Sequence, residues 1–250
     1  MNDFHDKVAI VTGAGSGIGA AIARELAERG AIVIAADLDL TAAQDVASEI
    51  RGDGGRAHAI EVDVADPEAA ERLVDFAVET GGALHLAVNN AGIGGPDEPV
   101  ADYPLDGWRK VIDVNLNGVF YGMKYQIAAM LESGGGAIVN LSSILGSVGW
   151  AGASAYVTAK HGLIGLTKTA AIEYAQAGVR VNAVGPAFID TPLLSKNLDE
   201  ETLGQLAGLH PVGRLGTSEE VSALTCFLLS DRASFITGSY HLVDGGYTAR

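Results

Sequence analysis

The sequence predicts an α/β fold, a doubly wound parallel sheet of about seven strands with helices on both faces. Short β-branched runs alternate along the chain with longer segments whose apolar residues recur at helical spacing. This alternation is typical of a parallel sheet covered by its crossover helices. The 33 glycines among 250 residues suit the tight turns that such a chain needs. No linker, repeat or low-complexity tract divides the sequence, so we expect one domain over residues 1–250.

The strands and helices are expected in a regular order. Short apolar runs predict buried strands, and apolar positions with a period near 3.6 residues predict helices. Gly30 and Gly52 close two of the helices. The expected strands are Lys7–Val11, Ala31–Ala36, Ala57–Val62, Leu84–Asn89, Gly136–Leu141, Val179–Val184 and Tyr240–Val243. The expected helices are Ile18–Arg29, Thr41–Arg51, Pro67–Glu79, Asp106–Met130 (long enough to be interrupted), Ser154–Ala177 and Thr217–Leu229.

Three local signals refine this plan. Asp66 is expected to cap its helix, with Pro67 in the first turn, and Thr217 with Glu220 fits a capping box. The segment of about 187–211 shows no clear period. Because a long structureless loop in a compact domain is usually functional, we expect this segment to be a substrate lid.

The charge balance argues against two classes of partner. The chain has 31 acidic and 16 basic side chains, a formal net charge of −15, and such a surface repels nucleic acids and anionic membranes. Cys226 is the only cysteine, so no intrachain disulfide is expected, and the scattered histidines predict no catalytic metal. The polar N-terminus has no apolar signal core, and a cytoplasmic location is expected.

A glycine-rich turn, TGAGSGIG at Thr12–Gly19, directly follows one expected strand and opens a helix. Gly13, Gly17 and Gly19 would allow the tight turn, the close approach of a pyrophosphate and the packing of the helix on the sheet. The helix N-terminus would offer free N–H groups to the phosphates. The context predicts a dinucleotide site in a Rossmann-type sheet. The alternative is a glycine-rich turn without a ligand.

Asp37 lies at the end of the second expected strand, where this type of site carries an acid about 20 residues after the glycines. A carboxylate there accepts hydrogen bonds from ribose hydroxyls and repels a 2′-phosphate. No Arg or Lys lies in the turn or beside Asp37, so NAD is favoured over NADP. The alternative is an acid on the solvated surface.

Further motifs, in the right order, resemble the short-chain dehydrogenase/reductase family over nearly the whole chain. The glycine turn matches the family's pattern, and the family's usual length matches this one. The other motifs are Asp63-Val64, Asn89-Asn90-Ala91-Gly92, the tetrad Asn115, Ser143, Tyr156 and Lys160, and Val243-Asp244-Gly245-Gly246.

The resemblance implies a catalytic tetrad and a nicotinamide site. The chain departs from the family in one place, because Pro186-Ala187 stands where Pro-Gly is usual. If the family glycine has a positive φ, Ala187 would cost roughly 1 kcal/mol or shift the start of the lid. The residues expected at the cofactor are Gly13, Ser16, Gly17, Ile18, Gly19, Asp37, Leu38, Asp63, Val64, Asn90, Ala91, Gly92, Tyr156, Lys160, Pro186, Ile189 and Thr191.

The tetrad has chemistry that suits proton transfer during hydride transfer. A phenol has a pKa of ~10, but Lys160 at i+4 and an oxidised nicotinamide would favour the tyrosinate of Tyr156. Ser143, thirteen residues before the Tyr as in the family, would position the substrate oxygen, and Ser142 is its near competitor. For Asn115 the family implies a structural water and a proton path through Lys160. The alternatives are a Tyr–Lys pair on an exposed helix and a buried Asn satisfied by backbone.

The expected pocket is apolar, which favours a neutral, moderately bulky secondary alcohol or ketone as substrate. The alternative is that these side chains only close the core. A 3-oxoacyl-carrier-protein reductase-like enzyme and, in a different class, a non-catalytic NAD-sensing protein remain competing interpretations. Apolar and small residues on the two long helices suggest a homotetramer or homodimer. The expected pocket residues are Leu145, Trp150, Phe188, Leu193 and Leu194.

Overall fold

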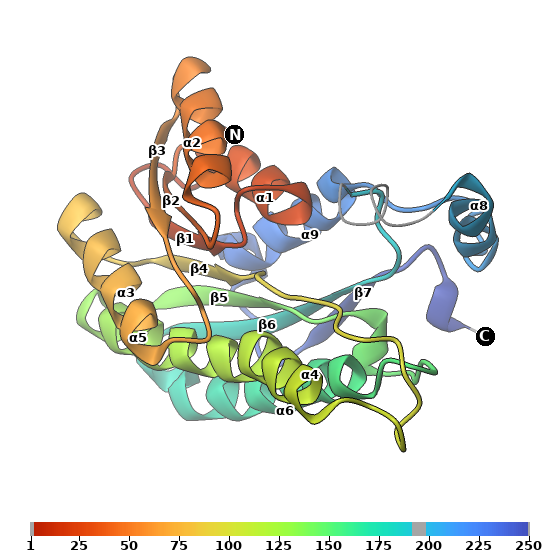
Figure 1. The fold of residues 1–250 in the computed structure, drawn as a ribbon. Coiled ribbons are helices and arrows are strands. Elements are labelled where there is room, and N and C mark those ends of the chain that lie inside the picture. The colour runs from red at the N-terminus through yellow and green to blue at the C-terminus, as the bar shows by residue number, and fades with distance from the viewer. Residues whose placement is uncertain (1–2, 192–198, 250) are drawn as a thin grey trace.

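A seven-stranded parallel sheet forms the centre of the computed structural model, which describes residues 3–191 and 199–249. The strand order is β3-β2-β1-β4-β5-β6-β7 (Figure 1). The strands before β4 are added on one side of β1 and the later strands on the other, so the strand order reverses between β1 and β4. This arrangement confirms the predicted fold class. The strands are β1 (Val8–Thr12), β2 (Ile32–Asp37), β3 (Arg56–Glu61), β4 (Leu86–Asn89), β5 (Gly136–Leu141), β6 (Val179–Pro186) and β7 (Tyr240–Val243).

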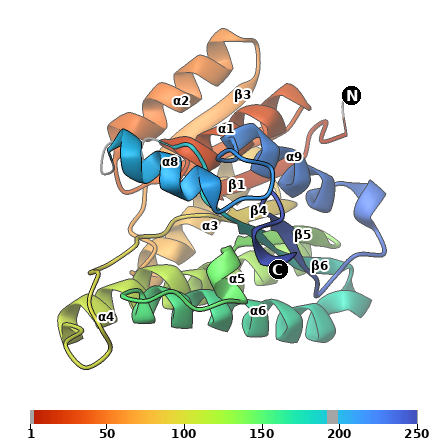
Figure 2. The same ribbon diagram turned by 90° about the vertical axis from the view of Figure 1, so that its right-hand side faces the viewer.

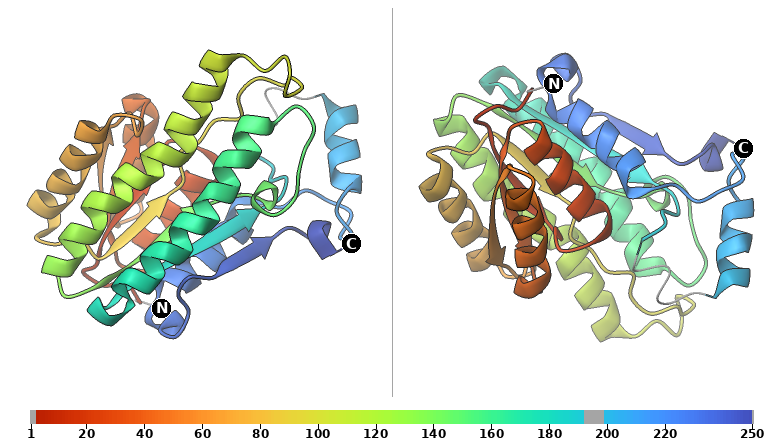
Figure 3. Two further views of the ribbon diagram at one scale, coloured as in Figure 1. Left: turned by 90° about the horizontal axis from the view of Figure 1, so that it is seen from below. Right: turned by 90° about the horizontal axis from the view of Figure 1, so that it is seen from above.

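Helices cover both faces of the sheet. One face carries α1, α2 and α9, and the other carries α3, α5 and α6, with α5 and α6 side by side (Figure 3). The strand ends agree with the predicted ones to within two residues. The helices are α1 (Gly17–Glu28), α2 (Leu40–Gly52), α3 (Pro67–Gly81), α4 (Leu105–Ile112), α5 (Gly118–Glu132), α6 (Ser154–Tyr174), α8 (Glu200–Gly208) and α9 (Ser218–Leu229).

Two buried cores follow from the alternation of side chains along each strand. Ala9 and Val11 face the core under α1 and α9, whereas Val8 and Ile10 face the core under α3 and α5. Because both faces are covered, every residue of β1 is buried, and its first four residues, Val8–Val11, form a continuous apolar run. Among the described residues, no helix is long and apolar enough to cross a membrane.

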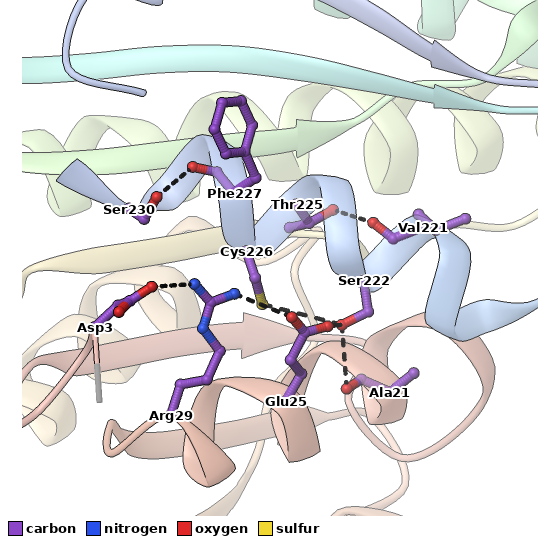
Figure 4. A network of polar contacts seen from close by, with 10 residues as sticks. All are labelled: Asp3, Ala21, Glu25, Arg29, Val221, Ser222, Thr225, Cys226, Phe227 and Ser230. Carbon is purple, nitrogen blue, oxygen red and sulfur yellow. Dashed lines mark hydrogen bonds and ion pairs between the residues drawn. The ribbon is translucent and has the colours of Figure 1, made fainter. Parts of the chain in front are cut away.

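A polar cluster joins α1 to α9 away from the carboxyl edge of the sheet (Figure 4). Ser222 Oγ donates to a carboxylate oxygen of Glu25 over 2.5 Å, and Arg29 bonds both Glu25 and Asp3. Cys226 is fully buried beside them, and burial raises the pKa of its thiol. The cysteine therefore packs as an inert side chain between the two helices.

The predicted helix caps are present. Asp66 accepts a hydrogen bond from the N–H of Glu68, with Pro67 in the first turn of α3. Thr217 and Glu220 form the reciprocal capping box of α9. These two caps fix where α3 and α9 begin.

Two of the longer segments need a closer description. The helix expected over 106–130, which is long enough to be interrupted, is indeed interrupted by a π-helical turn, Asp113–Asn117, between α4 and α5. The segment of about 187–211, predicted as a loop, contains α8, whose N-cap Asp199 accepts from the N–H of Thr202. The α8 helix and the C-terminal turn lie beyond the carboxyl ends of β6 and β7 (Figure 2).

Candidate active site

The glycine turn between β1 and α1 has a geometry that only glycine permits at two positions. Gly13 has a φ of +65°, in the left-handed region, and Gly17 has a φ of +52°. A Cβ on Gly19 would collide with the carbonyl of Gly13, so helix and turn approach as closely as backbones can. The turn thus has the shape that lets a phosphate reach the backbone.

The first turn of α1 and Asp37 together suit a dinucleotide. Ser16 is the N-cap, but its side chain makes no capping bond, so the first N–H groups of α1 are left for another acceptor. The Asp37 carboxylate accepts from the N–H of Gly15 over 2.8 Å and from the N–H of Asp39 over 3.0 Å. Leu38 is 66% exposed beside it. The carboxylate is therefore held against the phosphate turn rather than free on the surface.

Asn90 acts on the turn from the neighbouring strand. Its Nδ2 donates to the carbonyls of Thr12 and Gly13, while Thr12 Oγ1 accepts from the N–H groups of Asn90 and Ala91. These bonds tie the end of β4 to the end of β1. The side chain of Asn90 thus holds the glycine turn in place, and Gly92 follows directly.

The remaining predicted cofactor residues lie at the carboxyl edge of the same sheet. Asp63 and Val64 follow β3, and Asp63 closes a tight turn by accepting from the N–H of Ala65. Pro186 ends β6, and Ile189 is buried just after it. The other two expected residues are Ile18, partly buried in α1, and Thr191, at the end of the described segment.

Ser143 rather than Ser142 faces the reacting position. Ser142 Oγ donates to the backbone carbonyl of Lys160, so it serves to fasten α6 to the sheet. Ser143 Oγ accepts from the N–H of Leu145 and lies near enough to the phenol of Tyr156 to lower the pKa of that group. The structure thus pairs Ser143 with the candidate acid/base.

Tyr156 and Lys160 lie one helical turn apart on α6. Lys160 is only 4% exposed, its Nζ donates to the carbonyl of Leu141, and Nζ lies 5.3 Å from the centroid of the Tyr156 ring. Burial lowers the pKa of Lys160 to about 8. Burial raises the pKa of Tyr156, and the nearby Ser143 hydroxyl acts in the opposite direction. A further cation over the pocket would favour the tyrosinate more.

Asn115 sits in the π-helical turn and is fully buried. Its Nδ2 donates to the carbonyls of Ile93 and Val111, and its Oδ1 accepts from the N–H of Ile93. Backbone groups of Ile93 and Val111 satisfy this side chain, which agrees with the alternative interpretation of Asn115 as a buried Asn bonded to backbone. Asn115 holds the Gly92–Ile93 backbone close to Lys160, since a Cβ on Gly92 would lie 3.6 Å from Lys160 Nζ.

Tyr240, which the sequence did not single out, reaches the active site from β7. Its hydroxyl donates to the backbone carbonyl of Ser143. To do so the ring crosses β6 at Gly185, where a Cβ would collide with the phenol. Only the pairing of β5, β6 and β7 reveals this contact, because 97 residues separate Tyr240 from Ser143.

Ala187 does not strain the start of the expected lid. Among the described residues, Asp6 is the one non-glycine residue with a positive φ, so Ala187 has an ordinary backbone. Its N–H donates to the carbonyl of Val243 over 3.1 Å, which continues the pairing of β6 with β7. The expected cost of replacing glycine here is therefore absent.

Of the five predicted pocket residues, Trp150 and Phe188 lie in contact with each other. Leu145 is buried, while Trp150 is 41% exposed with its ring centroid 5.6 Å from that of Phe188. Phe188 also contacts the rings of His210 and Tyr247, two residues that the sequence analysis missed. The other two predicted residues, Leu193 and Leu194, lie outside the described residues.

The C-terminal signature has a packing role. Asp244 accepts from the N–H groups of Gly246 and Thr248 and from the Thr248 hydroxyl. A Cβ on Gly245 would meet Val212 within 2.6 Å and His210 within 3.5 Å. The two glycines therefore let the segment after α8 pack directly on the end of β7.

Known proteins are similar in sequence to this chain over nearly its full length. The family model described as Enoyl-(Acyl carrier protein) reductase matches residues 13–248. The chain belongs to the short-chain dehydrogenase/reductase family. It is 52% identical to cyclohexanol dehydrogenase of Acinetobacter sp. (strain SE19), over 100% of this chain and 98% of that protein.

Two further relatives of the short-chain dehydrogenase/reductase family bear names that refer to six-membered rings. The chain is 47% identical to cis-4-hydroxycyclohexanecarboxylate dehydrogenase of Sinomonas cyclohexanicum, over 98% of both chains. It is 41% identical to 2,5-dichloro-2,5-cyclohexadiene-1,4-diol dehydrogenase of Sphingobium indicum, over 100% of both chains. The chain is accordingly an oxidoreductase of this family, and its relatives are dehydrogenases of alcohol groups.

Proposed function

We propose that this enzyme interconverts a neutral secondary alcohol on a six-membered ring and the corresponding ketone, with Tyr156 as acid/base. The observation that carries the proposal is the pairing of Tyr156 with Ser143 and the buried cation of Lys160 at the carboxyl edge of the sheet. The names of the relatives support a ring alcohol, and the apolar rings of Trp150 and Phe188 support a neutral one.

The mechanism follows from the positions of these side chains. Ser143 hydrogen-bonds the substrate oxygen and holds it near the phenol of Tyr156. In oxidation, Tyr156 takes the alcohol proton, and Lys160 stabilises the resulting tyrosinate from its buried position. The glycine turn and Asp37 would hold a nicotinamide dinucleotide, which would supply the acceptor for the hydride of the carbinol carbon. In reduction, Tyr156 returns the proton to the ketone oxygen.

We propose NAD as the cofactor. Asp37 supports it, because a carboxylate beside the phosphate turn would repel a 2′-phosphate. The described turn and its flanks carry no basic side chain that could offset this repulsion. Residues 187–211 would form the lid over the substrate, with α8 as its helical part.

The test of this function is an absorbance assay at 340 nm with cyclohexanol, cyclohexanone and both cofactors. We expect turnover with NAD(H) and much weaker turnover with NADP(H). Tyr156→Phe should lower turnover by more than about 100-fold, because it removes the proton acceptor. NADH binding, followed by fluorescence, should stay nearly intact in that variant.

Three outcomes would contradict the proposal. Near-normal turnover by Tyr156→Phe would contradict the assignment of Tyr156 as the acid/base. Equal use of NADP(H) would remove the NAD assignment and favour the 3-oxoacyl-carrier-protein reductase-like alternative. NADH binding without turnover of any alcohol or ketone would favour a non-catalytic sensor.

We propose further that the protein is cytoplasmic and forms a homotetramer or homodimer. Phe120 on α5 and Ile172 on α6 support an interface, since they are 50% and 82% exposed on the helices of one face. Light scattering after size exclusion should give two or four times the chain mass of 25.6 kDa. A single-chain mass would rule the assembly out.

A further inference from the structure

The C-terminal turn, Tyr247–Ala249, places an aromatic ring against Phe188, one of the expected pocket residues. The turn lies beyond the carboxyl end of β7 (Figure 2). The centroid of the Tyr247 ring lies 6.0 Å from that of Phe188 and 5.7 Å from that of His210. No step of the mechanism above uses Tyr247.

Phe188 belongs to a segment that starts next to the candidate catalytic serine. The Tyr240 hydroxyl is bonded to the Ser143 carbonyl, and the same hydroxyl would collide with a Cβ on Gly185. Ser143 and Gly185 therefore lie on two sides of one phenol oxygen. Phe188 follows three residues after Gly185, and Trp150 lies on the loop between Ser143 and α6. The rings of Trp150 and Phe188 meet at 5.6 Å between centroids, so this pair joins the two segments that leave the site at Ser143.

The turn that carries Tyr247 is held by hydrogen bonds of its own. The Asp244 carboxylate accepts from the N–H groups of Gly246 and Thr248 and from the Thr248 hydroxyl. Burial acts to raise the pKa of Asp244, but the bonds from Thr248 and Gly246 hold it below its ordinary value, so the acceptor stays charged. The N–H of Tyr247 donates to the Asp244 carbonyl over 3.0 Å. Tyr247 is thus presented to Phe188 by a fixed turn.

Phe188 needs such a support because it borders a cavity of about 140 Å³, of which Trp150 is not a lining residue. A ring beside free space can change rotamer without a collision, so other side chains must hold it against Trp150. Tyr247 meets the Phe188 ring at an interplanar angle of 64° and His210 meets it at 89°, both in the edge-on arrangement that attracts aromatic rings. His210 is buried, whereas Tyr247 is half-buried and can be replaced without opening the core.

We propose that Tyr247 determines specificity through Phe188: it holds this ring against Trp150, where the two rings pack on the ring of a cyclic alcohol. The inference rests on the proposed function and concerns the preference for cyclic over small acyclic alcohols. The proton and hydride transfers at Tyr156 and Ser143 remain as described, and Tyr247 is a positioning residue. An alcohol such as 2-propanol has no ring to pack on Phe188, so its turnover does not depend on Tyr247.

The experiment compares cyclohexanol with 2-propanol, at a saturating NAD concentration, in the wild type and two Tyr247 variants. Tyr247→Ala should raise the KM for cyclohexanol about 10-fold, with kcat changed less than about twofold, because Phe188 can turn into the cavity and ring binding is lost. The kcat/KM for 2-propanol should change less than about twofold. Tyr247→Phe keeps the ring and should behave like the wild type.

A double variant separates positioning from direct contact. If Tyr247 acts only through Phe188, Tyr247→Ala should have no further effect in a Phe188→Ala background. A further rise in KM there would overturn the inference, since Tyr247 would contact the substrate itself. Tyr174→Ala is the matched control, because it removes a half-buried tyrosine of α6 that packs on the core. The same rise in KM in this control would also overturn the inference, because loss of stability would explain it.

Fluorescence gives a second measurement, which needs no turnover. The chain has two tryptophans, so Trp150 is the only one in a Trp108→Phe background. There, Tyr247→Ala should raise the acrylamide quenching of Trp150 about 1.5-fold, because Phe188 no longer covers one edge of the indole. NADH binding should verify that each variant is folded.

The outcomes distinguish the inference from the proposed function. Unchanged quenching of Trp150, or an unchanged KM for cyclohexanol in Tyr247→Ala, would overturn the inference, while wild-type turnover of cyclohexanol would leave the proposed function standing. Wild-type turnover of neither alcohol would overturn both.

Discussion

Lys160, the cation that we propose acts beside Tyr156, lowers the stability of the fold. Its ammonium is 4% exposed, and the one hydrogen bond described for it goes to the carbonyl of Leu141. No carboxylate forms an ion pair with it among the described residues. An unpaired buried charge destabilises the fold, which is why the pKa of Lys160 lies near 8 and not near 10.5. The same charge is what the tyrosinate needs beside it.

Replacing Lys160 with Met should therefore stabilise the protein while nearly abolishing turnover. The folded-state pKa of Lys160 is lowered, so the destabilisation is complete below pH 8 and fades as the pH rises toward 10.5. The gain in unfolding free energy of Lys160→Met over the wild type should be larger at pH 7 than at pH 10 by about 2 kcal/mol. Urea unfolding without cofactor measures it, and Lys168→Met on the same helix is the control. A gain that does not depend on pH would contradict the buried charge.

The sequence predicts some residues of the candidate active site and does not predict others. Tyr156 and Lys160 could be predicted because their spacing places them on one helix face, and Ser143 because a motif fixes its distance from the Tyr. Tyr240 could not, since it belongs to no motif and its partner Ser143 lies 97 residues away in the sequence. Asn115 was predicted as a site residue, but its bonding to Ile93 depends on a turn that no local signal shows.

At the scale of elements, the strands β5, β6 and β7 together position Ser143, the serine that we propose binds the substrate oxygen. Tyr240 of β7 reaches over β6 at Gly185 and donates to the Ser143 carbonyl beyond β5. The contact joins three strands through one side chain. Ser143 Oγ accepts from the N–H of Leu145, and a rotation of the Ser143 backbone would move the hydroxyl away from Tyr156. Tyr240 is thus a positioning residue.

Tyr240→Phe should lower kcat by about 10-fold in both directions, because the Ser143 carbonyl loses the bond that orients it. KM and NADH affinity should change little, since the phenol does not belong to either binding site. The pH profile of kcat should shift as well, because Ser143 and Tyr240 both act on the pKa of Tyr156. Leu242→Ala, two residues along β7, is the control. A rise in KM at constant kcat would show that Tyr240 contacts substrate instead.

Two elements were only partly predictable, for different physical reasons. The helix of 106–130 shows one continuous apolar period, and the π-helical turn arises because Asn115 bonds both the N–H and the carbonyl of Ile93. That constraint is tertiary and leaves no trace in the local pattern. The α8 helix has nine residues, two of them glycines, so its propensity is weak and its Asp199 cap is the main local signal.

At the scale of the whole molecule, the sheet collects its functional groups along one edge while the surface carries a large negative charge. The glycine turn, Asn90 and Ser143 follow β1, β4 and β5, and Pro186 is the last residue of β6. All four strands end at that edge. This convergence could be predicted, because parallel strands must end together. The net charge of −15 opposes the binding of an anionic cofactor at this edge, since it repels the cofactor from every direction.

Salt should therefore tighten the binding of NADH. The phosphate turn supplies neutral N–H groups, and the one buried cation of the site, Lys160, is screened by salt far less than surface charges are. Raising NaCl from about 20 to about 200 mM should weaken the long-range repulsion and lower the Kd of NADH roughly twofold. Fluorescence titration measures it, with uncharged adenosine as a ligand whose Kd should stay constant. A Kd that rises with salt would mean that basic side chains hold the phosphates.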